Sequence, residues 1–312
     1  MKIPKTRARR SLLIVLLLLA VAAPALGQAK QHTWSGVERI VAVGDLHGEY
    51  DAFVKILRAA KVIDDKNNWI GGKTHLVQMG DILDRAPDSR RAMDLLMKLE
   101  GQAVKAGGRV HAIIGNHEAM VLLGEWHYVH PGEIRAFGGE EAYRKAMGPK
   151  GKYGKWIRRL NAVIKVNDTL FVHAGLDEKY AKMSRAKLND AIRKGLQPDS
   201  HTGAATDQRG PLWYRGNALM IESDLKEDLD LICKTHEVKR IVVGHTITGS
   251  RRIETRAGGR VIMVDVAMSQ FYKRYGGGRA ACLIIEKGEL YELYEGKKKQ
   301  KLGAAEKKAA PR

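Results

Sequence analysis

VHAIIGNHEAM, residues 110–120, joins a β-branched apolar run to three consecutive polar residues, Asn116, His117 and Glu118. The apolar run predicts a buried strand, and the Gly-Asn pair after it predicts a turn. A single Asn-His pair in a loop is usually solvated surface. These polar residues therefore indicate a function only if other strand ends in the chain carry side chains of the same kind.

Short apolar runs of this kind recur along the chain, and each ends at a glycine or a polar cluster. They are RIVAVGDLHG (39–48), HLVQMGDILDR (75–85), TLFVHAGL (169–176), RIVVGHT (240–246) and VIMVDVAMS (261–269). Stretches with helical periodicity, such as EYDAFVKILRAAKVI (49–63), lie between them. Strands alternating with helices predict an α/β fold of layered sheets with helical covers, in which ligands collect at the carboxyl ends of the strands.

The predicted strand ends supply side chains that bind divalent metals. These are Asp45, His47, Asp81, Asn116, His173 and His245, which follow or close five different runs. A lone His at a strand end is usually structural, but agreement among five strand ends indicates one shared site. The absence of thiolates favours Mn²⁺, Fe²⁺ or Zn²⁺ in a catalytic site over a structural zinc site. Because one catalytic ion would not use so many ligands, we expect two ions that share a carboxylate.

The motifs GDLHG, GDILDR, GNHE, HAGL and GHT, in this order, resemble those of the calcineurin-like metallophosphoesterases, in their phosphoprotein phosphatase branch. GDLHGEYDAF (44–53), LLGEWHYV (122–129) and PLWYRGN (211–217) are most similar to the bacterial Shewanella-like protein phosphatases. The resemblance spans about residues 38–270. It implies a four-layer α-β-β-α sandwich, with two mixed sheets flanked by helices and a dimetal centre at the strand ends.

The resemblance also implies a role for each metal ligand. It places Asp45 and His47 on the first ion, with Asp81 as the bridging carboxylate. It places Asn116, His173 and His245 on the second ion. Mn²⁺ is the metal that we expect, and iron or zinc would suit the same ligands.

The same resemblance implies the groups that act on the substrate. His117 is the expected general acid, and Asp84 is the carboxylate that orients its imidazole. Arg85 is expected to grip two phosphate oxygens, which a lysine could not do. Arg215 stands where related phosphatases have a second phosphate-binding arginine, and Asn116 is expected to contact the substrate as well as a metal.

Two departures from the family pattern bear on the activity. His173-Ala174-Gly175 stands where the family often has His-Gly-Gly, which adds a methyl group but removes no ligand. Gly244-His245-Thr246-Ile247 lacks the second His of the Gly-His-x-His motif found in many nucleases and diesterases of the wider superfamily. The second departure favours a phosphomonoesterase.

Several further polar residues have a structural and a functional interpretation. Glu118 is expected to cap a helix or support a ligand, and Asp265, at the end of a sixth strand, could support the site or cap a turn. His75, His111 and His236 have no predicted partners and are interpreted as structural. Trp126, His127 and Tyr128 are structural by default, although they could line the rim of a substrate pocket.

The ends of the chain differ in composition from its middle. Residues 1–27 have the basic, apolar and small-residue regions of a secretory signal peptide, with cleavage expected near residues 25–28 and a secreted or periplasmic product without a membrane span. The catalytic domain is expected over residues 34–295, with a helical insertion over 120–160 as a cap and a hairpin turn at Lys287-Gly288. Residues 296–312 carry seven basic residues and one acidic residue and predict a disordered tail.

Composition leaves three functions open. The leading hypothesis is a dimetal phosphomonoesterase that hydrolyses phosphoprotein, plausibly phosphotyrosine but also phosphoserine or phosphothreonine, by in-line attack of a metal-bridging hydroxide. A small phosphoester, a nucleotide or a dinucleoside polyphosphate is the alternative substrate, since the net charge of +19 suits any of them. The third hypothesis is a basic protein with an inactive metal site that binds nucleic acid or lipid. No specific nucleic acid is expected as a partner of the enzyme, its tail could adhere weakly to acidic surfaces, and the oligomeric state and a Cys233–Cys282 disulfide are left open.

Overall fold

The computed structural model describes residues 31–303 except 198–199 and 201. The predicted signal peptide and residues 304–312 of the predicted tail lie outside this range. The first sheet contains, in order, β1 (Thr33–Trp34), β5 (Val163–Val166), β6 (Thr169–Val172), β7 (Arg240–Val243), β9 (Val261–Met263) and β8 (Glu254–Arg256). The second contains β12 (Gln300–Lys301), β11 (Glu289–Tyr294), β10 (Ala281–Glu286), β2 (Arg39–Val43), β3 (His75–Gln78) and β4 (Arg109–Ala112).

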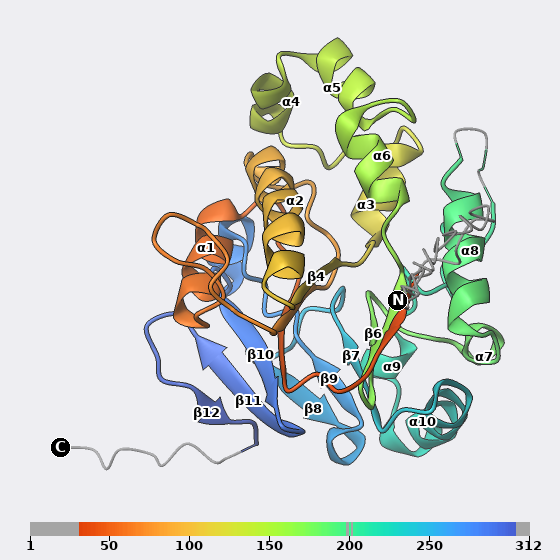
Figure 1. Ribbon diagram of the computed structural model, residues 1–312. Coiled ribbons are helices and arrows are strands. Elements are labelled where there is room, and N and C mark those ends of the chain that lie inside the picture. The colour runs from red at the N-terminus through yellow and green to blue at the C-terminus, as the bar shows by residue number, and fades with distance from the viewer. Residues whose placement is uncertain (1–30, 198–199, 201, 304–312) are drawn as a thin grey trace, which may run out of the picture. The chain divides into compact units, whose positions relative to one another are not determined.

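Helices flank both sheets (Figure 1). Those beside the second sheet are α1 (Tyr50–Ala59) and α2 (Ser89–Lys105). Those beside the first are α7 (Glu178–Ala181), α8 (Arg185–Gly195), α9 (Gly216–Leu219) and α10 (Glu222–His236). There are also two 3₁₀ segments, η1 (Ala257–Gly259) after β8 and η2 (Gln270–Tyr275) after β9. The predicted sandwich of two mixed sheets flanked by helices is confirmed.

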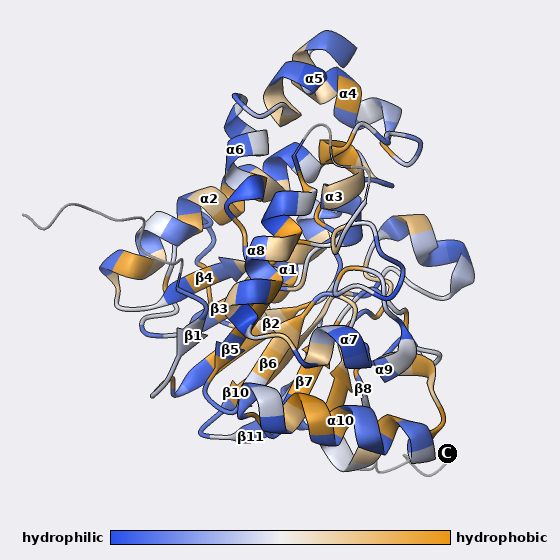
Figure 2. Cartoon of the chain, turned by 90° about the vertical axis from the view of Figure 1, so that its right-hand side faces the viewer, coloured by the Kyte–Doolittle hydropathy of each residue, from blue (hydrophilic) through white to orange (hydrophobic). Residues whose placement is uncertain are grey.

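The core strands are apolar on both faces because helices cover one face of each sheet and the other sheet covers the other. Every residue of β3 and β6 is buried, and Figure 2 shows the inner strands as mostly hydrophobic. In the second sheet β2, β3 and β4 run parallel to one another, and in the first sheet β6, β7 and β9 do so. Each parallel set therefore presents its carboxyl-end loops along one edge.

The segment 120–160 is helical, as predicted. It contains the end of α3 (Asn116–Leu122) followed by α4 (Pro131–Phe137), α5 (Glu140–Met147) and α6 (Lys152–Arg158). Its small core forms where the Tyr143 ring meets Trp126 and Phe137 edge-on, at 5.2 and 5.0 Å between ring centroids. The segment packs on α2 through α4, where buried Glu133 accepts a 2.7 Å hydrogen bond from Ser89.

The C-terminal segment differs from the prediction of a tail that is disordered from residue 296. Residues 300–301 form β12, which pairs antiparallel with β11 at the edge of the second sheet. The amide of Leu302 also donates to the carbonyl of Leu290 at 2.9 Å. The lysines of this segment balance acidic neighbours, because Lys299 pairs with Glu286 and Lys301 with Glu289. Backbone pairing thus holds residues 300–302, in a segment whose composition alone predicts disorder.

The hairpin predicted near the C-terminus is confirmed by the antiparallel pairing of β10 with β11. Its two turn residues, Lys287 and Gly288, have φ of 50° and 83°, as a tight two-residue hairpin turn requires. Cys282 lies buried in β10, and both it and Cys233 are free thiols. Among the residues that the structure describes, every helix is too short or too polar to cross a lipid bilayer.

His75 and His111 form a buried pair between β3 and β4. His111 Nε2 lies 3.1 Å from His75 Nδ1, and the Trp34 ring covers His111 at 4.2 Å between centroids. One imidazole must donate and the other accept, so at least one of the two rings must be neutral. Burial accordingly lowers the pKa of His111 to about 3.

This pair predicts a loss of stability at mildly acidic pH. Since the folded pKa of His111 lies below its unfolded value, the unfolded state binds more protons below about pH 6.5, and stability falls as the pH falls. We expect His111 to lower the free energy of unfolding by about 2 kcal/mol between pH 7 and pH 5. The measurement is urea unfolding at pH 7 and at pH 5. Between these pH values, the free energy of unfolding should fall by about 2 kcal/mol less in His111→Gln than in the wild type. Equal losses in the two proteins would contradict this account.

Candidate active site

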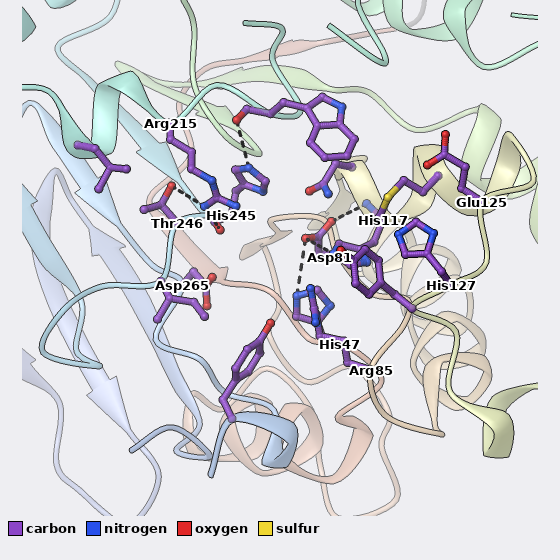
Figure 3. Close-up of a pocket in the computed structure, with 17 residues that line it drawn as sticks. His47, Asp81, Arg85, His117, Glu125, His127, Arg215, His245, Thr246 and Asp265 are labelled. Atoms are coloured by element: carbon purple, nitrogen blue, oxygen red, sulfur yellow. Dashed lines mark hydrogen bonds and ion pairs between the residues drawn. The ribbon is translucent and has the colours of Figure 1, made fainter. Parts of the chain in front are cut away.

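The carboxyl edges of the two parallel strand sets meet at a cavity of about 500 Å³ (Figure 3). The second sheet contributes His47 after β2, Asp81 and Arg85 after β3, and Asn116 and His117 after β4. The first sheet contributes His245 after β7 and Asp265 after β9, and Arg215 comes from the loop before α9. His173, after β6, lies fully buried behind Asp81 and Asn116. The two sheets therefore bring together side chains that are far apart in the sequence.

Backbone carbonyl groups orient the imidazoles of His47 and His173. His47 Nδ1 lies 3.1 Å from the carbonyl oxygen of Leu83, and His173 Nδ1 lies 2.7 Å from that of Met79. When each Nδ1–H donates to its carbonyl and the ring is neutral, the Nε2 atom of each ring carries the lone pair that could bind a metal ion. Both Nε2 atoms face Asp81, at 3.7 and 3.3 Å from its carboxylate oxygens. This is the outer support that metal-binding imidazoles usually have.

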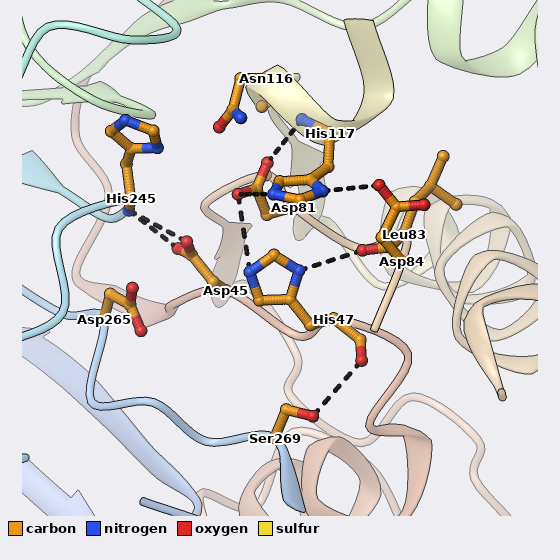
Figure 4. A network of polar contacts seen from close by, with 12 residues as sticks. Asp45, His47, Asp81, Leu83, Asp84, Asn116, His117, His245, Asp265 and Ser269 are labelled. Atoms are coloured by element: carbon orange, nitrogen blue, oxygen red, sulfur yellow. Dashed lines mark hydrogen bonds and ion pairs between the residues drawn. The ribbon is translucent and has the colours of Figure 1, made fainter. Parts of the chain in front are cut away.

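Asp81 lies at the centre of two potential metal clusters (Figure 4). One cluster contains His47, Asp81 and His117, and the other contains Asp81, His173 and His245. Within each cluster the ligand atoms lie within 4.8 Å of one another, and every member is buried. The amide oxygen of Asn116 is 3.0 Å from His173 Nε2 and adds a neutral oxygen to the second cluster. Two ions that share Asp81 fit this donor set of imidazoles, carboxylates and an amide oxygen.

Several buried carboxylates lie close together in the site, and their mutual repulsion favours the binding of cations. Burial and the neighbouring Asp265 and Asp81 raise the pKa of Asp45 well above its usual range. Burial raises the pKa of Asp265 to about 6. Burial opposes ionisation of Asp81 too, yet His173 and His117 hold its pKa well below the usual value. Divalent cations would offset the repulsion among these carboxylates.

The carboxylate of Asp45 accepts a backbone N–H group, which is not the contact expected of a ligand of the first metal ion. Both of its carboxylate oxygens accept the backbone N–H of His245, at 3.1 and 3.0 Å, and it belongs to neither cluster. This contact links the end of β2 to the end of β7, and so one sheet to the other. The assignment of Asp45 as a ligand of the first ion therefore stays a prediction.

Non-glycine residues with left-handed backbone are concentrated at this site. His47, Asp81 and His245 have φ of 48°, 51° and 59°, and Asp84 and Arg85 have φ of 73° and 69°. Such conformations disfavour L-residues and persist where surrounding contacts impose them. In the loops that follow the strands, these sharp turns direct His47, Asp81, Arg85 and His245 into the cavity, whereas Asp84 is buried and does not line it.

Glu118 imposes the turn that carries Asp81. Its buried carboxylate accepts backbone N–H groups from Asp81 at 2.9 Å, Ile82 at 2.8 Å and Leu83 at 3.1 Å. It also accepts the N–H of Gly115, the N-cap residue of α3, at 2.8 Å, which is the glutamate half of a capping box. Both interpretations of Glu118 from the sequence hold at once, because a single carboxylate caps the helix and supports the loop of the predicted ligand Asp81.

Glycine is required where the loops after β3 and β4 meet. Gly80 has φ of 91°, and a Cβ there would lie 2.7 Å from the Gly115 nitrogen and 2.8 Å from His173 Nδ1. A Cβ on Gly115 would lie 2.2 Å from Asp81 Oδ1. The glycines of GDILDR and GNHE thus allow the two loops to approach each other closely.

His117 and Asp84 form the pair expected of a general acid and its orienting carboxylate. His117 Nδ1 lies 2.6 Å from Asp84 Oδ2, while His117 Nε2 faces Asp81 Oδ2 at 3.9 Å. Burial lowers the pKa of His117 and raises that of Asp84 to about 8. The short contact fixes the ring so that Nε2 is the atom directed into the cavity.

Two guanidinium groups face the cavity. Arg215 Nη1 donates to the carbonyl of His245 at 2.7 Å and to Thr246 Oγ1 at 3.1 Å, which leaves its other nitrogen atoms available. Arg85 lies against aromatic rings, with its Cζ 4.7 Å from the Tyr128 centroid and 5.3 Å from that of Phe271. Its buried Nε has no hydrogen-bond partner in the structure. Both side chains can therefore accept an oxyanion as a partner.

The cavity also contains residues that sequence reasoning assigned to no role. Trp213 and Tyr272 line it, and the Trp213 carbonyl lies 3.2 Å from His245 Nε2. Neither residue is charged or of a metal-binding type. Trp213 belongs to the PLWYRGN motif (211–217), but no local pattern marked either side chain as part of a cavity. Of the aromatic segment considered as a rim, His127 and Tyr128 line the cavity, whereas Trp126 is directed into the helical insertion.

The insertion supplies less of a cap than the sequence predicted. From residues 120–160 only Met120, Glu125, His127 and Tyr128 line the cavity. The helices α4, α5 and α6 contribute no lining residue, and Figure 1 shows α4 and α5 above α2 and α6 beside α3. Instead, α4 packs against α2, and α5 and α6 follow it in a chain of helix–helix contacts.

Comparisons with known proteins agree with this geometry. The model of a family described as calcineurin-like phosphoesterase matches residues 38–249. Shewanella-like protein phosphatase 1 of Plasmodium berghei is 34% identical over 251 residues, which cover 76% of this chain and 68% of that protein. Shewanella-like protein phosphatase 2 of Arabidopsis thaliana is 27% identical and is matched over 72% of its length by 75% of this chain. The crystal structure of a cold-active protein-tyrosine phosphatase from a psychrophilic Shewanella species has 31% identity and a TM-score of 0.76, covering 88% of this chain and 84% of that one.

Proposed function

We propose, from the premise that the chain belongs to the calcineurin-like phosphoesterase family, that it hydrolyses phosphoprotein and prefers phosphotyrosine. The observation that carries this proposal is the position of Asp81 in two ligand clusters, in a cavity that Arg85 and Arg215 also line. The similar proteins with phosphatase names, and the protein-tyrosine phosphatase structure among them, support the same substrate class.

The ligands would hold two divalent ions. His47, Asp81 and Asp45 are proposed for one site, and Asp81, Asn116, His173 and His245 for the other. When bound, the two ions would lower the pKa of a water nucleophile and offset the negative charge of the phosphoryl group. We propose Mn²⁺ as the native metal, and measuring metal content together with activity after reconstitution with Mn²⁺, Fe²⁺ or Zn²⁺ would test this.

The side chains around the ions divide the remaining work. Arg85 and Arg215 would bind the non-bridging phosphate oxygens and orient the phosphoryl group for in-line displacement. His117 would donate its Nε2 proton to the leaving oxygen, while Asp84 holds the ring by its Nδ1 atom. Glu118 would act indirectly by keeping Asp81 in place.

Aromatic surroundings of the leaving group favour phosphotyrosine. The Tyr128 ring lies 5.3 Å from the His117 ring and 4.7 Å from the Arg85 guanidinium, so it stands between the proposed acid and a phosphate ligand. Tyr272 also lines the cavity, with its ring 6.0 Å from the His47 ring. An aryl group leaving towards His117 would pass beside Tyr128 and could stack on it. A serine side chain would leave that contact unused.

The function is tested with matched substrates. Protein beginning at residue 28 and loaded with Mn²⁺ is given phosphotyrosine and phosphoserine peptides of the same sequence, together with a panel of nucleotides. Turnover of a phosphopeptide supports the proposal, and the ratio of kcat/KM for the two peptides measures the preference. Turnover of nucleotides alone would keep the chemistry but reject the substrate class.

Replacing Tyr128 should change the preference between the two peptides. Tyr128→Ala is expected to lower kcat/KM for the phosphotyrosine peptide by about 5-fold, since an aromatic pair contributes about 1 kcal/mol. The phosphoserine peptide should be hydrolysed almost as before. Tyr128→Phe keeps the ring and is the matched control, which should resemble the wild type. Equal losses on both peptides would show that Tyr128 does not select the leaving group.

Export of the enzyme is proposed from its first residues. The sequence MKIPKTRARR followed by LLIVLLLLAVAA has the form of a secretory signal. Expressing the full chain in a bacterial host, fractionating the cells and sequencing the N-terminus of the product would test it. A mature end near residues 25–28 in the periplasmic or extracellular fraction supports export, and an intact chain in the cytoplasm would contradict it.

A further inference from the structure

We propose that η2 and the neighbouring Arg251 form a basic shelf beside the active site that binds acidic residues next to the phosphorylated residue of the substrate. This inference rests on the proposed function and goes beyond it, because it names the kind of protein segment that the enzyme selects. The shelf is defined here as Gln270–Tyr275, with the sequence QFYKRY, together with Arg251.

The shelf is continuous with the catalytic cavity. Tyr272 lines that cavity, while Gln270, Phe271, Lys273 and Arg274 line a shallow hollow of about 610 Å³ beside it. The Phe271 ring also packs on the guanidinium of Arg85 at 5.3 Å. A peptide whose phosphoryl group lies between the metal ligands and Arg85 can therefore extend over this segment.

Contacts to the loop of a metal ligand hold the shelf in place. Ser269 Oγ accepts the amide of Phe271 at 3.3 Å and donates to the carbonyl of His47 at 3.5 Å, a contact visible in Figure 4. Glu49 accepts the amide of Gln270 at 2.9 Å. The segment ends at Gly276, which has φ of 83°. These contacts fix the shelf relative to the site where the phosphoryl group would bind.

The charge of the shelf is positive and lacks internal compensation. Lys273 and Arg274 are exposed, and neither they nor Arg251 have a carboxylate partner within the described part of the chain. Arg251 is bound by its Nε to the Tyr275 carbonyl at 3.2 Å, which places its charge beside the other two. Glu49 is the one carboxylate that the described contacts give this segment, and a backbone amide occupies one of its oxygens.

Exposed aromatic rings lie among these cations. The Phe271 and Tyr275 side chains are 39% and 56% exposed, and the Arg274 guanidinium lies 5.9 and 4.9 Å from their ring centroids. Cations held on aromatic faces are less free to move and offer a defined surface to a carboxylate. Charge complementarity and continuity with the catalytic cavity together point to an acidic peptide segment. Nucleic acid and anionic lipid would match the positive charge of the shelf, but its continuity with the catalytic cavity gives no reason to expect them.

The test compares two phosphotyrosine peptides that differ only in having Asp or Asn on both sides of the phosphorylated residue. Initial rates and anisotropy-based binding are measured for the wild type and for Lys273→Ala/Arg274→Ala, with Lys150→Ala/Arg159→Ala as the control that removes the same charge elsewhere. A small aryl phosphate, such as p-nitrophenyl phosphate, reports on the chemical step alone.

We expect the wild type to prefer the Asp peptide by about 5-fold, mainly through KM, as two exposed ion pairs would give. The shelf variant should lose that preference and hydrolyse the Asn peptide and the aryl phosphate as before. The control variant should keep the preference, and about 0.5 M salt should remove most of it. Equal KM values for the two peptides in the wild type, or a preference that survives in the shelf variant, would overturn the proposal.

The two proposals fail in different ways. If the protein hydrolyses no phosphopeptide, the proposed function fails, but the shelf still predicts tighter binding of the Asp peptide than of the Asn peptide. If both peptides are hydrolysed and bound equally, the function stands and the shelf is rejected. Binding of nucleic acid or anionic vesicles that depends on Lys273 and Arg274, without any peptide preference, would also reject it.

Discussion

Replacing Asp81 with asparagine is expected to abolish phosphoester hydrolysis and to remove at least one bound metal ion. Among the described residues, Asp81 is the one common to both candidate metal clusters, so the change removes a charged group from both. Removing a residue that hydrogen-bonds to a metal ligand lowers metal affinity or activity by about 10- to 100-fold. Removing a ligand shared by two ions should lower activity by more than about 100-fold. Initial rates and metal content by mass spectrometry measure the effect.

The Asp81→Asn variant should still fold. Its amide keeps an oxygen that can accept the backbone N–H of His117, which Asp81 Oδ1 accepts at 3.0 Å. Circular dichroism and thermal melting of the metal-free proteins are therefore expected to be similar. Asp190→Asn, an exposed change on α8, is the matched control and should retain full activity. A folded Asp81→Asn enzyme with two ions and normal kcat would contradict the shared-ligand assignment.

Replacing Glu118 with glutamine is expected to cost both stability and activity. Oε1 accepts the amides of Ile82 and Leu83, and Oε2 accepts those of Asp81 and Gly115. Glutamine has an NH₂ group in place of one of these oxygens. The two backbone N–H groups that this oxygen accepts then lose their acceptor and face another donor. An unsatisfied buried group of this kind costs about 1–3 kcal/mol, and more where a charge had been bound. We expect a loss of about 2–4 kcal/mol in urea unfolding.

The activity of Glu118→Gln should fall as well, although Glu118 lies behind the ligands and not among them. The loop that it holds carries Asp81, and a small displacement of a reacting geometry is costly. Glu141→Gln, an exposed change on α5, should alter neither property and serves as the control. A loss of stability below about 0.5 kcal/mol, as for an ordinary surface substitution, would show that water replaces the lost contacts.

The residues at the strand ends could be predicted because their pattern is local. A buried strand needs a short apolar run, and the GD and GN pairs that follow mark the loops where Asp81 and Asn116 emerge. The hairpin at Lys287-Gly288 could be predicted for the same reason, because a two-residue turn needs positive φ. The role of Glu118 was only half visible, since helix capping is local but its contacts with residues 81–83 are not.

By itself, the sequence determined the alternation of strands and helices, the metal-binding residue types and the order of the family motifs. The tertiary structure alone decided that β2–β4 and β6, β7 and β9 belong to different sheets whose edges meet at Asp81. It also turned Asp45 towards His245, packed α4 on α2 away from the cavity, added β12 to the second sheet and brought η2 beside Arg85. Periodicity and turn chemistry act over a few neighbouring residues, whereas these contacts join segments that meet only when the whole core is packed.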